Sequence, residues 1–230
     1  MTRRANSAVA GFTFLLYIAL AYPAMSLSAR ASAGDGIPAK LATLAEHAAD
    51  VRLSAVLFLL SSFCALILAV TLYRITCEED ADIAMLGMIC RVAEGIAGGG
   101  LVPALGLMWL ATTSRAGMAD GASANTLAGF LFKVQDWDLI VASTFFAVGS
   151  TAFAYLFVRG RIIPAPLAWL GFLGSAVLAT GLVLQLAGVV SASVINIMFI
   201  PLALFEIPLG FWLLIKGARA PEKLRATGVS

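Results

Sequence analysis

The chain has 230 residues, of which 61% are hydrophobic and only 12% are charged. Soluble domains contain about 45–50% apolar residues, so this composition excludes a soluble globular protein and indicates an integral membrane protein, with membrane lipid as its surroundings. The net charge of +2 is small. A nucleic-acid-binding surface needs a concentrated basic patch, so nucleic acid is excluded as a partner.

Six segments are apolar over the about 20 residues that a helix needs to cross a bilayer. The third is long, so we expect it to tilt or to emerge from the bilayer. The pattern predicts an all-α membrane protein, with residues 1–230 forming one transmembrane domain built as a six-helix bundle. The predicted spans are Ala8–Leu27, Val51–Tyr73, Ile83–Thr112, Trp137–Val158, Leu167–Val190 and Val194–Ile215.

The first span also has features of a secretory signal, because Arg3 and Arg4 precede an apolar stretch that is followed by small residues. The apolar stretch continues to Leu27 and is longer than the about 7–15 residues of a signal core. We therefore expect an uncleaved first helix. Cleavage would leave five spans.

Positive charges predict the orientation, because short cytoplasmic loops carry an excess of Lys and Arg. With six spans, nine basic residues lie on the side of the termini and five on the opposite side. Indoles favour the headgroup level, and Trp109, Trp137, Trp169 and Trp212 lie near predicted span ends. The sequence therefore predicts a multi-pass membrane protein with both termini in the cytoplasm.

The two long connections on the opposite side differ in pattern. Residues 38–50 carry Leu41, Leu44 and Ala48 at helical spacing, which predicts a short helix at the membrane surface. Residues 113–136 are rich in Ser, Thr, Gly and Asn, which predicts a solvated connection.

Cysteine and histidine content indicates neither a metal site nor a cofactor. Cys64 and Cys90 fall within spans and Cys77 in a loop, without paired spacing, so no disulfide framework is indicated. His47 is the only histidine. It is expected to be a solvated loop residue, with a pH-responsive role as the alternative.

Three charged residues lie deep within predicted spans: Arg91, Glu94 and Glu206. A charge at that depth costs from about 2.5 to more than 10 kcal/mol, so it normally faces a partner or a water-filled cavity. Counted at 1.5 Å per residue, all three lie at about the same depth. This shared depth predicts a contact between Arg91 and Glu206, with Glu94 close by.

The helix face that carries Arg91 is also expected to be buried. Arg91 and Glu94 are neighbours on that face because they are three residues apart. The same face carries Gly87, Gly95 and Gly98, and small residues in membrane helices mark close helix contacts. The face is therefore predicted to pack against protein rather than lipid.

The sixth span is interrupted near Glu206 by Pro201 and Pro208, each of which leaves one carbonyl without its helical hydrogen bond. Broken helices beside an acidic residue are typical of transporter sites. Gln185 and Asn196 could extend a polar cavity from Glu206, or could instead bond to a neighbouring helix.

Short motifs resemble a known family from the second span onward. The motifs are Leu72-Tyr73-Arg74, Arg91-Val92-Ala93-Glu94, Phe145-Phe146 through Tyr155-Leu156 with Arg159 and Ile163-Pro164, and Pro201, Glu206 and Trp212-Leu213-Leu214 through Gly217. This order is similar to the bacterial membrane-protein family called domain of unknown function 4386. The resemblance implies a six-span inner-membrane protein and no particular reaction.

Two classes of function are compatible with these residues. In a structural or accessory membrane protein, Arg91, Glu94 and Glu206 would only hold helices together, and this is the favoured interpretation. In a transporter-like protein, the same residues would bind a small molecule, an ion or a proton. No nucleophile can be paired with a base, so an enzyme is the least favoured class. Substrate and oligomeric state do not follow from the sequence.

Overall fold

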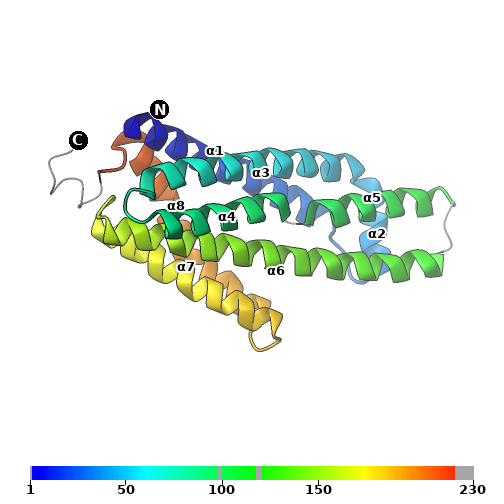
Figure 1. Cartoon of the computed structure of the whole chain (residues 1–230). Helices are drawn as coiled ribbons and strands as arrows, with labels where there is room; N and C mark the ends of the chain where they lie inside the picture. Colours follow the sequence, from blue (N-terminus) through cyan, green and yellow to red (C-terminus); the bar gives the residue numbers. More distant parts are fainter. Residues whose placement is uncertain (1, 98–99, 118–120, 221–230) are drawn as a thin grey trace.

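A computed structural model describes residues 2–97, 100–117 and 121–220. These residues form α-helices and no strand (Figure 1). The helices are α1 (Arg3–Ala31), α2 (Ile37–Glu46), α3 (Ala48–Thr76), α4 (Ala81–Ala97), α5 (Leu101–Arg115), α6 (Gly121–Arg159), α7 (Ala165–Leu186) and α8 (Ala192–Ile215). Six segments are long and apolar enough to span a membrane, with α4 and α5 together forming one of them. The predicted all-α, six-span fold is confirmed.

Six helices form a closed ring. Going around it, α1 contacts α3, α3 contacts α4, α4 contacts α6, α6 contacts α7, α7 contacts α8, and α8 returns to α1. Figure 1 shows that α6 runs the full length of the bundle, whereas α7 and α8 cover only the half nearer the N-terminus. We call this the terminal half, and we call the part built by α2, α5 and the first half of α6 the distal half.

Glycines allow the helix backbones of the terminal half to touch. A Cβ atom on Gly11 of α1 would lie 2.4 Å from the Leu214 nitrogen and 2.6 Å from the Gly210 oxygen of α8. A Cβ atom on Gly171 of α7 would lie 2.5 Å from the ring of Phe205. Small residues at such contacts are the usual means of close packing between membrane helices, so α8 is held closely on both sides.

The third predicted span is not one helix. Helix α4 ends at Ala97 and α5 begins at Leu101, after Gly100 with a left-handed φ of 86°. The Gly100 N–H donates a hydrogen bond to a carboxylate oxygen of Asp138, at 3.1 Å. A left-handed φ costs glycine little because glycine has no Cβ, which explains why α5 begins anew after Gly100.

The distal half contains helix where the sequence predicted a loop. Residues 113–136, predicted to be a solvated connection, mostly belong to the end of α5 and the start of α6. Ala124 and Ala128 are spaced by one helical turn and are buried in a small core with Leu41, Leu44 and Leu107. The helix predicted from Leu41 and Leu44 is confirmed as α2, whose apolar face packs against α5 and α6.

Charged residues tie the terminal end of the bundle together. Arg3 pairs with Glu78, and Arg159 pairs with Glu79 and Asp80 at 3.1 Å each. An Arg4 nitrogen donates to the Ile215 carbonyl at 2.7 Å. The start of α1 and the end of α8 therefore lie at the same end of the bundle.

Candidate functional site

The face of α4 that carries Arg91 points into the ring. Arg91 is only 1% exposed and Glu94 only 8%. Gly87 packs against the Phe153 ring of α6, and Gly149 of α6 packs against the Arg91 side chain, where a Cβ would lie 3.1 Å from the Arg91 Cγ. The predicted burial of this face is confirmed for these residues, while Gly98 lies outside the described residues.

Glu94 is held from two helices. The Arg91 Nη1 atom lies 2.9 Å from one carboxylate oxygen of Glu94. The hydroxyl of Tyr17, on α1, donates a hydrogen bond to the other oxygen at 2.9 Å. Sequence reasoning missed Tyr17, although a tyrosine deep in an apolar span was the available signal, because a buried tyrosine hydroxyl usually finds a partner.

Aromatic rings enclose the Arg91 guanidinium. Its central carbon lies 4.7 Å from the ring centre of Phe146 and 5.6 Å from that of Tyr17, distances that permit cation–π attraction. The approach to Glu94 is an ion pair without an aligned N–H bond, and none of the guanidinium nitrogens has a hydrogen-bond partner among the described residues. Arg91 is thus stabilised by charge and aromatic contact rather than by hydrogen bonds.

Glu206 does not pair with Arg91, so the predicted contact is wrong. Its side chain is 7% exposed, and among the described residues its Oε1 atom has no hydrogen-bond partner and the carboxylate no ion pair within 4.0 Å. It interacts with Arg91 and Glu94 only electrostatically. Helices α4 and α8 are not packed against each other, and equal depth in two spans does not show which of their side chains meet.

The structure does not bring the other predicted polar residues to this cluster. Asn196 is exposed and lies ten residues from Glu206 along α8, or about 15 Å. Gln185 is partly buried near the end of α7. Ile197 and Leu204, whose carbonyls the two prolines leave without helical partners, have side chains that are 65% and 61% exposed and face out of the bundle.

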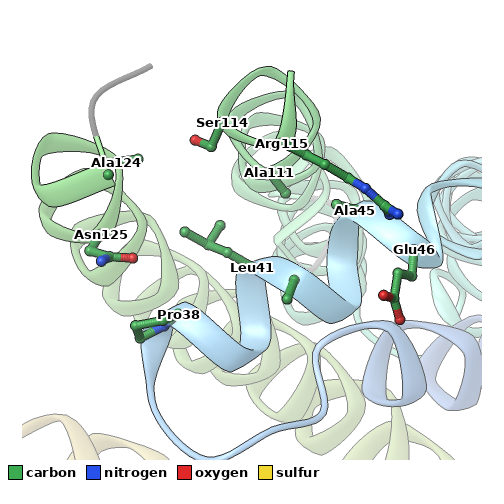
Figure 2. Close-up of a pocket in the computed structure, with 11 residues that line it drawn as sticks. Pro38, Leu41, Ala45, Glu46, Ala111, Ser114, Arg115, Ala124 and Asn125 are labelled. Atoms are coloured by element: carbon green, nitrogen blue, oxygen red, sulfur yellow. The ribbon is translucent and has the colours of Figure 1, made fainter. Parts of the chain in front are cut away.

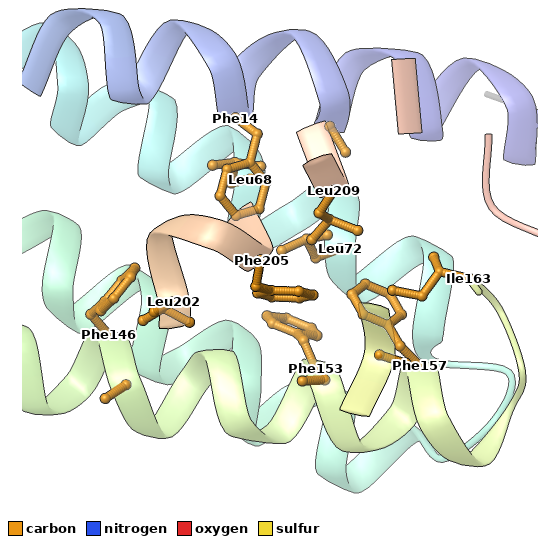
Figure 3. Packing of buried hydrophobic residues seen from close by; sticks show 14 of the residues in the cluster. Phe14, Leu68, Leu72, Phe146, Phe153, Phe157, Ile163, Leu202, Phe205 and Leu209 are labelled. Atoms are coloured by element: carbon orange, nitrogen blue, oxygen red, sulfur yellow. The ribbon is translucent and has the colours of Figure 1, made fainter. Parts of the chain in front are cut away.

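The interior near the cluster has little free space. A cavity of about 10 Å³ lies beside Arg91 and Ser150 and is otherwise lined by apolar residues, which is room for about one water molecule. Figure 3 shows the surrounding core, where Phe153 and Phe205 point into the ring from α6 and α8. The three charged residues are therefore buried, and this cavity beside Arg91 offers room for no more than about one water molecule.

A larger pocket lies elsewhere, in the distal half. It has a volume of about 370 Å³ and lies between α2, α5 and α6 (Figure 2). Leu41 and Ala111 contribute apolar surface, while Glu46, Arg115 and Asn125 lie around it. Neither this pocket nor the charged cluster supplies a metal centre, since no group of three His, Cys, Asp or Glu residues in the described ranges could hold a metal ion.

Comparison with known proteins gives a family but no activity. Neither the curated proteins nor the solved structures compared with the chain gave a match. One family model matches residues 9–217, which include every residue of the cluster. The chain therefore belongs to the family described as domain of unknown function, DUF4386.

Proposed function

We propose that this chain is a structural or accessory protein of the bacterial inner membrane, in which the network of Arg91, Glu94 and Tyr17 locks α4 to α1. The observation that carries this proposal is that Glu94 is buried and both of its oxygens are engaged, one by Arg91 of α4 and one by Tyr17 of α1. A transport site needs a path for its substrate, whereas a helix lock needs enclosed partners. The pair of Arg91 and Glu94 lies within α4 and holds the Glu94 carboxylate in place, while the Tyr17 hydrogen bond joins that carboxylate to α1. A buried pair is costly to break, so its loss should also weaken the link to α1.

A mutational cycle on Arg91 and Glu94 tests the lock. Arg91→Met leaves a buried carboxylate without its cation, so it should lower the free energy of unfolding by about 3–5 kcal/mol. Adding Glu94→Gln removes that charge and keeps an acceptor for Tyr17, so the double variant should recover most of the loss. The measurement is the melting temperature of each variant in detergent.

The matched control is the pair of Lys133 and Asp136, which has the same spacing on α6 but is 68% and 66% exposed. Exposed pairs contribute about 0–1 kcal/mol, so Lys133→Met should have little effect. Independent, additive losses for Arg91 and Glu94 would show that these residues are not coupled and would contradict the lock.

The orientation is part of the same proposal. The excess of nine over five basic residues supports a cytoplasmic location for the terminal end of the bundle. Reporter fusions after Gly121 and after Ala220 should therefore report opposite sides of the membrane, with Ala220 inside. The same side for both would contradict a six-span arrangement.

A transporter-like function is the second candidate, and the free carboxylate oxygen of Glu206 in a proline-containing helix favours it. A ligand that binds only the folded state raises its melting temperature. A thermal-shift screen of small molecules and ions should then give a hit that Glu206→Gln abolishes. A screen in which every hit stabilises both proteins equally would count against this candidate.

A further inference from the structure

The buried charges of the ring do not balance. Among the described residues, the buried charged groups in the middle of the ring are one cation, Arg91, and two carboxyl groups, Glu94 and Glu206, while the buried Glu79 pairs with Arg159 at the terminal end. Among the described residues, the helices that pack against α8 place no second buried cation beside the cluster. Tyr17 is the α1 group that reaches the cluster, Arg4 of α1 instead donates to the Ile215 carbonyl at the terminal end, and the buried polar residue of α7 is Ser175. In α3 and α6 the buried polar residues are serines and threonines. If both carboxyl groups were ionised, the cluster would carry a net negative charge inside the membrane, where an uncompensated charge is strongly disfavoured.

The contacts identify which carboxyl group should remain neutral. Glu94 receives the Arg91 cation on one oxygen and the Tyr17 hydroxyl on the other, and both contacts favour its ionised form. Glu206 receives no such contact, and its Oε1 atom is buried without a hydrogen-bond partner in the described part of the chain. We propose that Glu206 is a proton-binding site, whose carboxyl group holds one exchangeable proton and thereby makes the cluster of Arg91, Glu94 and Glu206 electrically neutral.

A proton fits this place better than a metal cation. Calcium and magnesium require about six or more oxygen ligands, and the described residues hold no group of three acidic, His or Cys side chains that could bind a metal. The cavity beside Arg91 measures only about 10 Å³, and the guanidinium repels any added cation. A proton needs one carboxylate oxygen and no additional space.

The site has a consequence for pH dependence that does not rest on the proposed lock. Loss of the proton in alkaline solution would add a second negative charge to the cluster and so lower the stability of the packed ring. In Glu206→Gln the new side chain has nearly the shape of a protonated glutamate and has no proton to lose, so the cluster keeps its charge balance at alkaline pH. The variant should therefore remain folded at neutral pH and should resist alkaline solution better than the wild-type protein.

Infrared spectroscopy of the purified protein tests the site directly. At neutral pH the wild-type spectrum should contain the carbonyl band of one protonated carboxylic acid, and titration to alkaline pH should remove it while lowering the melting temperature. Glu206→Gln should lack the band and most of that temperature change. The control Asp35→Asn, which alters an exposed carboxylate, should keep both.

Several outcomes would overturn the proposal. One is a wild-type spectrum without a protonated carboxyl band, a measurement that requires no variant to fold. Another is a band that persists in Glu206→Gln. A third is a melting temperature that rises with sodium relative to choline at constant pH in the wild type but not in Glu206→Gln, which would identify a metal cation as the ligand. Failure of the Arg91 and Glu94 cycle would leave the infrared result unaffected, so the two proposals fail separately.

Discussion

The terminal and distal halves of the bundle bury different kinds of side chain. The core of the terminal half contains five phenylalanines, Phe14, Phe146, Phe153, Phe157 and Phe205, and it encloses the charged cluster. The fully buried core of the distal half contains only Ala, Leu and Val. Aromatic side chains fill the wide interior of the six-helix ring and can attract a guanidinium. In the distal half, small alanine side chains allow a smaller number of helices to pack closely. A buried charge is thus found where enough helices and aromatic rings surround it.

The largest expected difference between the halves concerns their cores. Phe157 is 1% exposed in the terminal core, so Phe157→Ala should lower the free energy of unfolding by about 3–5 kcal/mol. Leu41 is buried but also lines the distal pocket, where the site can relax, so Leu41→Ala should cost about 2 kcal/mol, the low end for such changes. Chemical denaturation in detergent provides the comparison. A larger loss for Leu41→Ala would show that the distal half carries more of the stability.

Helix contact through glycine gives the next largest effect. Gly11→Ala would push a methyl group into the backbone of α8, and such overpacking costs about 1–3 kcal/mol. At Gly129, in the distal part of α6, an added Cβ would have no neighbouring atom within 4 Å. Gly129→Ala should therefore stabilise the helix by up to about 1 kcal/mol. Melting temperatures that fall equally for both variants would contradict the close contact between α1 and α8.

The junction between the halves should show a smaller effect. Asp138→Ala removes the acceptor for the Gly100 N–H at the break between α4 and α5, and loss of a comparable cap costs about 1 kcal/mol. Asp136→Ala is the control, because Asp136 forms only an exposed pair with Lys133. Hydrogen exchange of the α5 amides should increase in Asp138→Ala alone. Equal exchange in both variants would show that this bond does not hold the junction.

The smallest effect is expected at the terminal end, in acid. The Ile83 N–H and then the Arg159 guanidinium hold the pKa of Asp80 below its ordinary value of 3.8. A carboxyl group whose pKa is lowered by folding stabilises the protein at pH values above its ordinary pKa. This stabilisation is lost as the pH falls through the pKa of the group in the folded protein. The melting temperature of Asp80→Asn should therefore depend less on pH below about 4 than that of the wild type. Asp82→Asn, two residues later in the first turn of α4, is the control and should retain the wild-type slope.

The sequence was sufficient for elements whose signal lies within one helix. Apolar length predicted the six spans, and the spacing of Gly87, Arg91 and Glu94 predicted a buried face. The order of helices around the ring does not follow from apolar length, so the contact between Arg91 and Glu206 was predicted wrongly and Tyr17 was missed. The Ser, Gly and Asn residues at the start of α6 predict a loop, because the burial of Ala124 and Ala128 depends on contacts with α2 and α5 that the local sequence does not show.

Unequal helix length has a consequence for the surrounding lipid. Helix α7 has 22 residues and α6 has 39, which correspond to about 33 Å and 58 Å. A hydrocarbon layer of about 30 Å matches α7 and leaves the distal part of α6 beyond it, although Leu127 and Phe130 on that part are exposed. The perimeter of the protein therefore has two heights. Helices tilt, or the bilayer thickens locally, to reduce such hydrophobic mismatch. The lipid layer should therefore be thicker beside α5 and α6 than beside α7 and α8.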